Sequence, residues 1–325
     1  MDKPKEVDEN EKKPFRMTYA HELLLFGSPE MPLGLCQLYI ATPDQLCRLH
    51  HGMGALNGVQ VRLKTLTEQG FVQRGLIPTE KGRSPYYYTP NRRGIRYAAR
   101  KGVDVQEVYR ASREVDGQFL FVKHTVELND MLIAAATLKR SDPNYWLEDF
   151  RHERVLKRHP YTALWQGRSF SLIPDAFLDF RVALLSGRQL RWPILLEHDR
   201  GTEEQRQFRR RIRGYIILLR TQGYRQWFEA KGVRVAFSTI TGLDRLKRMR
   251  EWTRQELAST NDSKAMGKLF VFANFTKPLD PCRIWLNPCW YTIDDSHPIQ
   301  FLNNQHQRSV ETLTTSYSYS CDRNS

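Results

Sequence analysis

The sequence predicts an α/β (α+β) fold in two parts, an N-terminal winged helix-turn-helix followed by a PD-(D/E)xK-like core. Two patterns support this prediction. Helix, turn, helix and hairpin signals come first, and helical and extended segments then alternate in the order α-β-β-β-α-β. The 325 residues are enough for two domains with cores of their own. We expect a disordered arm at 1–16, a winged-helix domain at 17–104, an endonuclease-like domain at 117–302 and a disordered tail at 303–325.

The first part of the prediction rests on helix start and stop signals. Thr42 and Gln45 form a capping-box pattern at the start of a short helix. A second helix is expected over about 55–69, where apolar residues recur at helical spacing, and Gly70 is placed to end it. A turn-rich segment over 78–85 then separates two short strands. Helix, turn, helix and basic hairpin in this order are typical of a winged helix-turn-helix.

Positive charge is concentrated in this region. Between Arg62 and Lys101 there are ten Lys or Arg residues and two acids. The whole chain has a net charge of +14, which favours an anionic partner, most simply double-stranded DNA. The residues expected to contact DNA lie on the second helix and at the hairpin tip: Asn57, Gln60, Arg62, Lys64, Lys81 and Arg83. The alternatives are a winged helix used for protein contacts and a basic surface without a partner.

The composition also bears on compartment and on other classes of protein. The five cysteines are odd in number and scattered, so neither a disulfide framework nor a zinc site is expected. No apolar run approaches the ~20 residues of a membrane span, and no phosphate-binding glycine loop of an ATPase is present. We therefore expect a cytoplasmic protein with reduced thiols and no membrane partner. The oligomeric state is left open.

The second part of the prediction starts from the element order. Helices are expected over 121–138, 203–221 and 243–257, and strands over 145–151, 168–181, 191–199 and 233–238, with extra strands in 268–302. The segment 168–181 is either one long strand or a pair. Thr202 and Gln205 have the capping-box spacing at the start of the helix over 203–221. This order is that of the restriction-endonuclease-like core, in which an Asp and a Glu bind Mg²⁺ and a Lys helps to activate a water.

Three acids stand where this core would hold its metal. Pro174-Asp175 and Glu197 match the pattern, but Asp199 occupies the position of the Lys. Glu197 and Asp199 are two residues apart on a strand, so they share one face. Asp175, Glu197 and Asp199 are therefore candidate Mg²⁺ ligands, and together with Arg200 they form the candidate catalytic set. Arg200, or Arg209 on the next helix, would supply the missing cation, although an arginine is no base at neutral pH.

Three interpretations of these acids stay open: an active nuclease, a metal-binding site that does not cleave, and acids with a purely structural role. In the structural interpretation Asp199 and Arg200 form a salt bridge at the strand end, and Glu197 hydrogen-bonds the N-terminus of the following helix. Weaker candidates lie on the first helix and first strand of the core: His124, Glu127, Asn129, Asp130 and Glu148. Of these, Asp130 is expected to orient Arg200.

Four segments together resemble the replication-relaxation family. They are His124-Thr125-Val126-Glu127-Leu128-Asn129-Asp130, Trp146-Leu147-Glu148, Pro174-Asp175, and Glu197-His198-Asp199-Arg200-Gly201-Thr202-Glu203 followed by Tyr215. The last segment is the most specific, and an upstream winged helix belongs to the same pattern. The resemblance covers about residues 40 to 260. It implies a bacterial mobile element, such as a plasmid, and a role in replication or DNA relaxation, with replication or mobilisation proteins as further partners.

Residues and resemblance together predict a DNA-binding protein of a bacterial mobile element that acts in replication or DNA relaxation, and they leave open whether it is also a metal-dependent nicking nuclease. The alternative is a non-enzymatic winged-helix regulator of transcription or of replication assembly.

Overall fold

The structure is a computed structural model. It describes residues 31–50, 55–77, 79, 84–105, 119–165, 167–258, 263–277 and 279–302. The arm and tail expected at the two ends lie outside the described residues, and so do Lys81 and Arg83. None of the described helices combines the length and the apolar character needed to cross a membrane.

The N-terminal part is a small module of helices and one hairpin. The two predicted helices and the predicted strand pair are present, and two further helices, over 31–38 and 92–100, were not predicted. Its elements are α2 (Met31–Leu38), α3 (Pro43–His50), α4 (Leu56–Glu68), β1 (Val72–Leu76), β2 (Tyr86–Pro90) and α5 (Arg92–Arg100). The capping box forms: the Thr42 N–H donates to Gln45 Oε1 (3.0 Å), and the Gln45 N–H donates to Thr42 Oγ1 (3.2 Å). Gly70 follows α4 with a φ of 72°, a left-handed conformation that suits glycine.

The larger part is built on a five-stranded sheet in the order β3-β6-β7-β8-β9. The strands are β3 (Tyr145–His152), β6 (Ala176–Ala183), β7 (Gln189–Asp199), β8 (Arg234–Thr239) and β9 (Phe270–Asn274). β3, β6 and β7 pair antiparallel, whereas β7, β8 and β9 pair parallel. The central strand β7 therefore has an antiparallel neighbour on one side and a parallel neighbour on the other.

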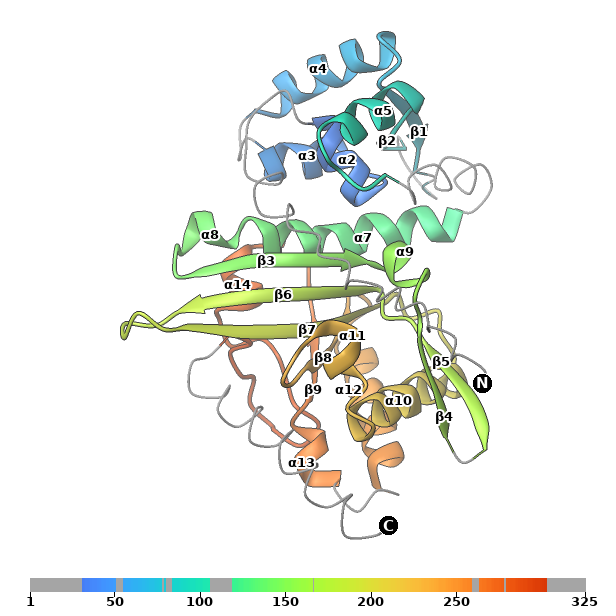
Figure 1. Ribbon diagram of the computed structural model, residues 1–325, viewed down its shortest axis with the longest axis vertical. Coiled ribbons are helices and arrows are strands. Elements are labelled where there is room, and N and C mark those ends of the chain that lie inside the picture. Colours follow the sequence, from blue (N-terminus) through green and yellow to red (C-terminus); the bar gives the residue numbers. More distant parts are fainter. Residues whose placement is uncertain are drawn as a thin grey trace, which may run out of the picture.

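Helices cover both faces of this sheet (Figure 1). On one face lie α7 (Phe119–Ala136) and α14 (Pro281–Trp285), and on the other lie α10 (Gln205–Arg220) and α12 (Leu243–Ala258). Successive strand residues point to opposite faces, so Leu196 and Ala236 join the core under α7 while Leu195 and Val235 join the core under α10 and α12. The remaining short helices are α8 (Leu138–Ser141), α9 (Glu153–Leu156), α11 (Tyr224–Phe228) and α13 (Ser263–Gly267). The structure thus combines α and β layers, in agreement with the predicted α/β (α+β) class.

One local prediction about this part is met only in part, and another is wrong. The segment 168–181 contains two strands of different sheets, because β5 (Arg168–Leu172) pairs with β4 (Tyr161–Trp165) in a separate hairpin and β6 starts only after Pro174-Asp175. The hairpin packs on α10, where a Cβ added at Gly214 would lie 2.1 Å from the Phe170 ring. The capping box expected at Thr202 does not form, because α10 begins at Gln205 with Glu204 at the N-cap and no side-chain cap.

Buried polar contacts join the N-terminal module to α7. Asn129 on α7 is fully buried, and its Nδ2 donates to the carbonyl oxygens of Leu38 (2.9 Å) and Ile40 (2.6 Å). These two carbonyls belong to the end of α2 and the turn after it, which leaves them without helical partners. The amide therefore caps α2 from another part of the chain.

Asp130, the next residue of α7, joins three segments. Its carboxylate accepts from Gln45 Nε2 (2.9 Å) and Arg48 Nη2 (2.5 Å) of α3, and Lys277 Nζ lies 2.8 Å away. Burial disfavours the charge of Asp130, but Lys277 and Arg48 outweigh it and hold its pKa below the usual range. The expectation that Asp130 orients Arg200 is therefore wrong.

Replacing Asp130 with Ala should lower the free energy of unfolding by about 2–3 kcal/mol, because Arg48 and Lys277 would lose a buried partner. The matched control is Asp44→Ala, which removes the exposed partner of the same Arg48 (2.9 Å) and should cost no more than about 0.5 kcal/mol. Urea denaturation of both variants measures the difference. Equal losses in the two variants would contradict the role given to Asp130.

Candidate functional site

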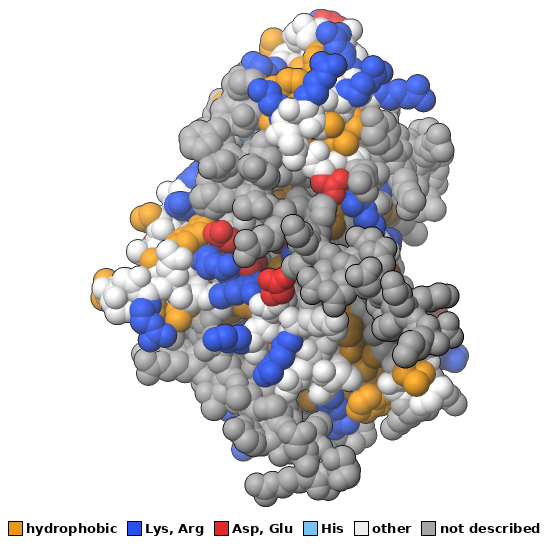
Figure 2. Space-filling model, in the orientation of Figure 1, with side chains coloured by type: hydrophobic (Ala, Val, Ile, Leu, Met, Phe, Trp, Pro, Cys, Tyr) orange, Lys and Arg blue, Asp and Glu red, His pale blue; other side chains and the backbone are white. Residues whose placement is uncertain are grey.

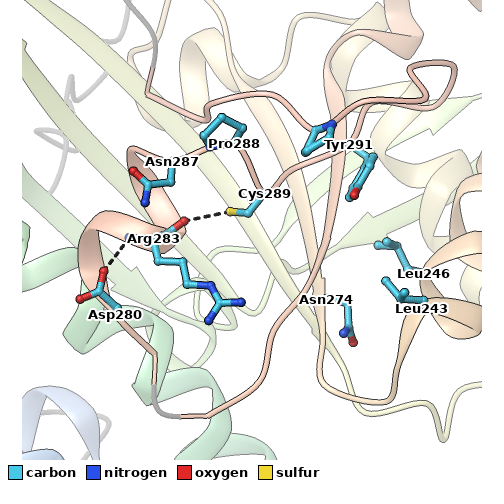
Figure 3. A pocket seen from close by; sticks show the side chains of 10 residues that line it. Leu243, Leu246, Asn274, Asp280, Arg283, Asn287, Pro288, Cys289 and Tyr291 are labelled. Carbon is cyan, nitrogen blue, oxygen red and sulfur yellow. Dashed lines mark hydrogen bonds between the residues drawn. The ribbon is translucent and has the colours of Figure 1, made fainter.

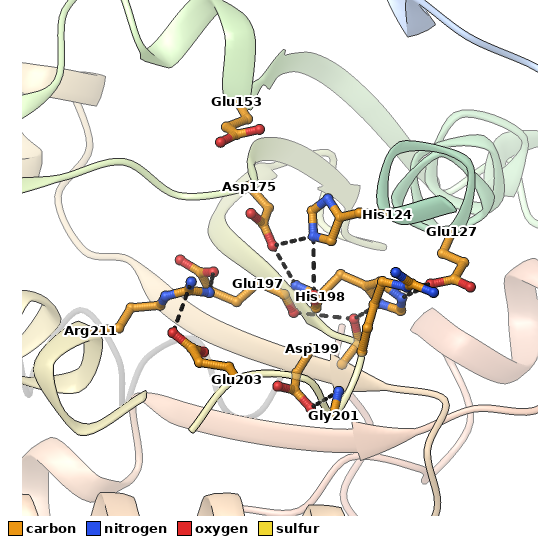
Figure 4. A network of polar contacts seen from close by, with 12 residues as sticks. His124, Glu127, Glu153, Asp175, Glu197, His198, Asp199, Gly201, Glu203 and Arg211 are labelled. Carbon is orange, nitrogen blue, oxygen red and sulfur yellow. Dashed lines mark hydrogen bonds and ion pairs between the residues drawn. The ribbon is translucent and has the colours of Figure 1, made fainter. Parts of the chain in front are cut away.

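The predicted acids come together at the carboxyl end of β7 (Figure 4). Ala176 pairs with Leu196, so the register places Asp175, just before β6, beside Glu197. Glu197 and Asp199 both reach helices that cover one face of the sheet, as their spacing predicts. His198 points to the opposite face, where its Nδ1 lies 2.9 Å from Ser238 Oγ.

Asp175 forms an ion pair with His124 of α7. Its Oδ2 accepts the backbone N–H of His198 (2.7 Å) and lies 3.3 Å from His124 Nε2. Burial disfavours charge on both side chains, but their mutual attraction, together with Glu153, Arg211 and the backbone of His198, outweighs it. These contacts raise the pKa of His124 to about 9 and hold the pKa of Asp175 well below its usual range. Both side chains are therefore charged at neutral pH.

Glu197 is bound by two side chains of α10. It is 1% exposed, its Oε2 lies 2.5 Å from Arg211 Nη1, and its Oε1 accepts from the Tyr215 hydroxyl. Arg211 also reaches Glu203 Oε1 (3.2 Å). Burial raises the pKa of Glu197, and the charge of Asp175 raises it further, while Arg211 and Tyr215 oppose this shift. The expected bond from Glu197 to the N-terminus of the next helix is not found; the carboxylate binds the middle of α10 instead.

Asp199 is bound on both oxygens by Arg245 of α12. Arg245 Nε donates to Oδ2 (2.8 Å) and Nη2 donates to Oδ1 (2.7 Å), while the Gly201 N–H also donates to Oδ2 (2.9 Å). Such a bidentate pair is among the stronger ion pairs in proteins. The salt bridge expected between Asp199 and Arg200 is therefore wrong.

The two candidate cations also have acidic partners of their own. Arg200 Nε lies 2.7 Å from Glu127 Oε2 of α7, and Arg209 pairs with Glu256 of α12. Each member of the predicted set is thus matched by an opposite charge within the protein.

This arrangement does not fit a magnesium ion held by Asp175, Glu197 and Asp199. Mg²⁺ needs free carboxylate oxygens and retained waters, but both oxygens of Glu197 and of Asp199 already accept from protein donors. In the part of the chain that the structure describes, no three His, Cys, Asp or Glu residues are grouped to hold a metal ion. A metal would have to displace Arg211, so the magnesium site stays a prediction.

Sequence reasoning missed Arg211 and Arg245, although a signal was present. Phe208 and Tyr215 lie on the buried stripe of α10, and Arg211 follows Phe208 by three residues and precedes Tyr215 by four. Arg245 likewise lies four residues before the buried Met249 of α12. An arginine at an apolar position of a helix predicts a buried carboxylate opposite it.

A hollow also lies at the carboxyl ends of β8 and β9, with a cavity volume of about 460 Å³ (Figure 3). Asn274, Arg283 and Cys289 are among its lining residues, and the predicted acids are not. Cys289 Sγ donates to the Arg283 carbonyl oxygen (3.1 Å), and burial raises the pKa of this thiol to about 12. The thiol therefore stays protonated at neutral pH and is a poor nucleophile.

The predicted DNA-contacting residues lie on the outer side of α4. Asn57, Gln60 and Lys64 are exposed and Arg62 is half-buried, whereas Val59 and Leu63 face the core of the module. Figure 2 shows Lys and Arg side chains gathered over the end of the molecule that carries α4 and α5. Residues 55–77 and 84–105 contain two acids, Glu68 and Asp104, and the following bases: Arg62, Lys64, Arg74, Arg92, Arg93, Arg96, Arg100 and Lys101.

The chain matches the replication-relaxation family over residues 35–233. The matched span holds most of the N-terminal module, α7 and the strands as far as β7, and it includes Asp175, Glu197, Asp199 and Arg200. No curated protein and no solved structure matches the chain.

The His124–Asp175 pair should make stability depend on pH. The folded-state pKa of His124 is raised from 6.5 to about 9, so its contribution is full below pH 6.5 and is lost as pH rises through 9. His124→Gln should thus cost at most about 3 kcal/mol near pH 6, and much less near pH 9.5. Denaturation of wild type and variant between pH 5.5 and 9.5 measures the difference. A cost that is the same at every pH would refute the ion pair, and His297→Gln, at an exposed position, is the control.

Proposed function

Because the chain belongs to the replication-relaxation family, we propose that it acts in the replication or relaxation of mobile-element DNA by binding duplex DNA through its N-terminal module. The observation that carries the proposal is the exposed outer side of α4, set among basic residues on a helix, turn, helix and hairpin scaffold.

The proposal treats this module as a winged helix. Ala41, between α2 and α3, forms a single antiparallel bridge with Tyr88 of β2 and so adds one bridge to the two-stranded β1–β2 hairpin. In winged helices of this order the second helix of the helix-turn-helix enters the major groove, and that helix is α4. α4 lies at the end of the molecule away from the sheet, while α3 packs against α7 (Figure 1). A duplex can therefore approach α4 without meeting the larger part.

Exposed polar and basic side chains on α4 suit this role. Asn57 and Gln60 offer amide groups that can read base edges, and Lys64 offers a charge for a phosphate. The basic residues of α5 extend the positive surface beyond α4; among them, Arg93 Nη1 donates to the Gln69 carbonyl oxygen (2.9 Å) and so ties α5 to the end of α4.

We assign the larger part a non-catalytic role, in which its acids are saturated by internal cations and the domain supports or extends the DNA contact. The second candidate function is a metal-dependent nicking nuclease on a PD-(D/E)xK-like core. The observation that favours it is the placement of Asp175 beside Glu197 at strand ends, in the element order of that core. Cleavage would require Arg211 to leave Glu197 when DNA or metal binds.

Lys64→Ala should weaken duplex binding and reduce the slope of log affinity against log salt by about one, since one phosphate contact is lost. The matched control is Lys247→Ala on α12. Lys247 is also an exposed lysine near one acid: its side chain is 74% exposed and 3.8 Å from Asp244, and that of Lys64 is 80% exposed and 4.0 Å from Glu68. Fluorescence anisotropy with a labelled duplex at several salt concentrations measures both. Equal slopes for the two variants would remove α4 from the interface.

Supercoiled plasmid distinguishes the two candidate functions. We expect the wild-type protein to bind the plasmid without relaxing it in Mg²⁺, in Mn²⁺ or in chelator, because the acids are occupied. Relaxation that requires metal and disappears in Asp175→Asn and Glu197→Gln, with DNA binding retained, would establish the nuclease instead. Lys64→Ala serves in the same assay to separate loss of binding from loss of cleavage.

A further inference from the structure

A second cavity lies at the opposite end of the sheet from the acids. It has a volume of about 340 Å³ and lies between the start of β7 and the segment that leads into β8. Four basic residues line it, Arg188, Arg191, Lys231 and Arg234, together with one acid, Glu229. Because β7 and β8 are parallel, this cavity at their amino ends is remote from Glu197 and Asp199 at their carboxyl ends.

Arg234 is buried here without a counter-ion. It is 4% exposed, and no carboxylate of the described residues pairs with it. Its Nε has no hydrogen-bond partner, and Nη1 makes one long bond to the Phe301 carbonyl oxygen (3.4 Å). Burial alone lowers its pKa, to about 10, so the side chain is still charged at neutral pH. Arg245, which is 5% exposed, has the bidentate Asp199; Arg234 differs from it in this respect.

Aromatic rings offset part of the free-energy cost of burying the charge of Arg234. The Arg234 Cζ lies 5.3 Å from the centre of the Trp192 ring and 5.9 Å from that of Phe301. Cation–π contacts of this kind stabilise a guanidinium but satisfy none of its N–H donors. Nε therefore stays buried without an acceptor in the described part of the protein, in a side chain that lines the cavity.

The walls of the cavity are rigid, and their charge is positive. Arg191 donates to Asp179 (2.9 Å) and to the backbone carbonyls of Phe228 (2.8 Å) and Glu229, which ties β6 and β7 to the segment before β8. The charges of Arg191 and Asp179 cancel each other. Arg188 and Lys231 are exposed at the rim and outnumber the single acid Glu229.

We propose that this cavity binds a phosphate group, with Arg234 as its principal donor. A guanidinium matches the oxygens of a phosphate with two N–H donors, and a buried one without a carboxylate gains most from such a partner. The rim bases then contact the remaining oxygens, and the volume leaves room for the sugar attached to the phosphate. The phosphate belongs either to a free nucleotide or to a DNA strand that reaches this side of the sheet.

Thermal unfolding in phosphate tests the site. Inorganic phosphate, titrated in the low millimolar range at constant ionic strength, should raise the melting temperature of the wild type by about 2–4 °C and then saturate. Saturation separates binding from the general stabilising effect of phosphate, which grows with concentration. Arg234→Met should abolish the saturable rise. Arg154→Met is the matched control, because Arg154 is also 4% exposed and lies against two rings, but outside this cavity.

A saturable rise in the wild type and in Arg154→Met, but not in Arg234→Met, supports the site. No saturable rise in the wild type, or an equal rise in Arg234→Met, overturns it. Should Arg234→Met fail to fold, Arg188→Ala at the rim provides the test, since phosphate affinity should fall several-fold with unchanged circular dichroism. An affinity that Arg188→Ala leaves unchanged also overturns the proposal.

Two further measurements identify the source of the phosphate. If it belongs to DNA, Arg234→Met should lower the salt slope of duplex binding by about one, as Lys64→Ala does on α4. If it belongs to a free nucleotide, duplex binding stays unchanged and calorimetric binding of a nucleoside monophosphate is lost. If Arg234→Met changes neither the salt slope of duplex binding nor the binding of a nucleoside monophosphate, the site is overturned, whether or not α4 binds DNA.

Discussion

The larger part of the structure depends on the need to neutralise carboxylates buried at the end of β7. Glu197 holds α10 through Arg211 and Tyr215, and Asp199 holds α12 through Arg245. His198 lies between them and Arg200 follows them, and both side chains approach Glu127 of α7 on the opposite face of the sheet. One strand end thus fixes the helices on both faces of the sheet. Apolar packing stabilises these layers, and the bidentate pair of Asp199 and Arg245 adds a directional contact that fixes α12 at the end of β7.

This constraint changes the meaning of residues that look catalytic. Acids at strand ends beside arginines are the composition of a nuclease site and also of a structural ion-pair network, and perturbed pKa values accompany both. The two kinds of site differ in whether a charged group is left without a partner of opposite charge. At this strand end each acid has its cation, whereas at the other end of the sheet none of the residues that the structure describes supplies an anion to Arg234. The place where the charges do not balance is therefore the more informative one.

Local patterns predicted the long helices and the main strands of the sheet but missed α2, α5 and β4. Tertiary contacts explain where the details of the predicted elements differ. The capping box at Thr42 forms through Gln45 Oε1, while the Nε2 of the same amide donates to Val126 and Asp130 of α7. At Thr202 the same spacing fails, because Glu203 is held outside the helix by Arg245 on its carbonyl oxygen (2.8 Å) and by Arg211 on its carboxylate. Asp175 was recognised from the Pro174-Asp175 pair ahead of one strand, and Glu197 and Asp199 from their two-residue spacing at the end of another. Their partners come from helices 14 and 46 residues away from them, a distance over which spacing carries no information.

The family match ends at residue 233, immediately before β8. The fold does not end there: β8 and β9 complete the sheet, and α12 supplies the arginine that Asp199 requires. A fragment cut at that boundary would expose β7 as a bare edge along a row of buried apolar residues, with unpaired backbone groups and an uncompensated acid. Such a fragment would be prone to edge-to-edge aggregation. The unit that must be expressed to study this family's residues is therefore longer than the segment by which the family is recognised.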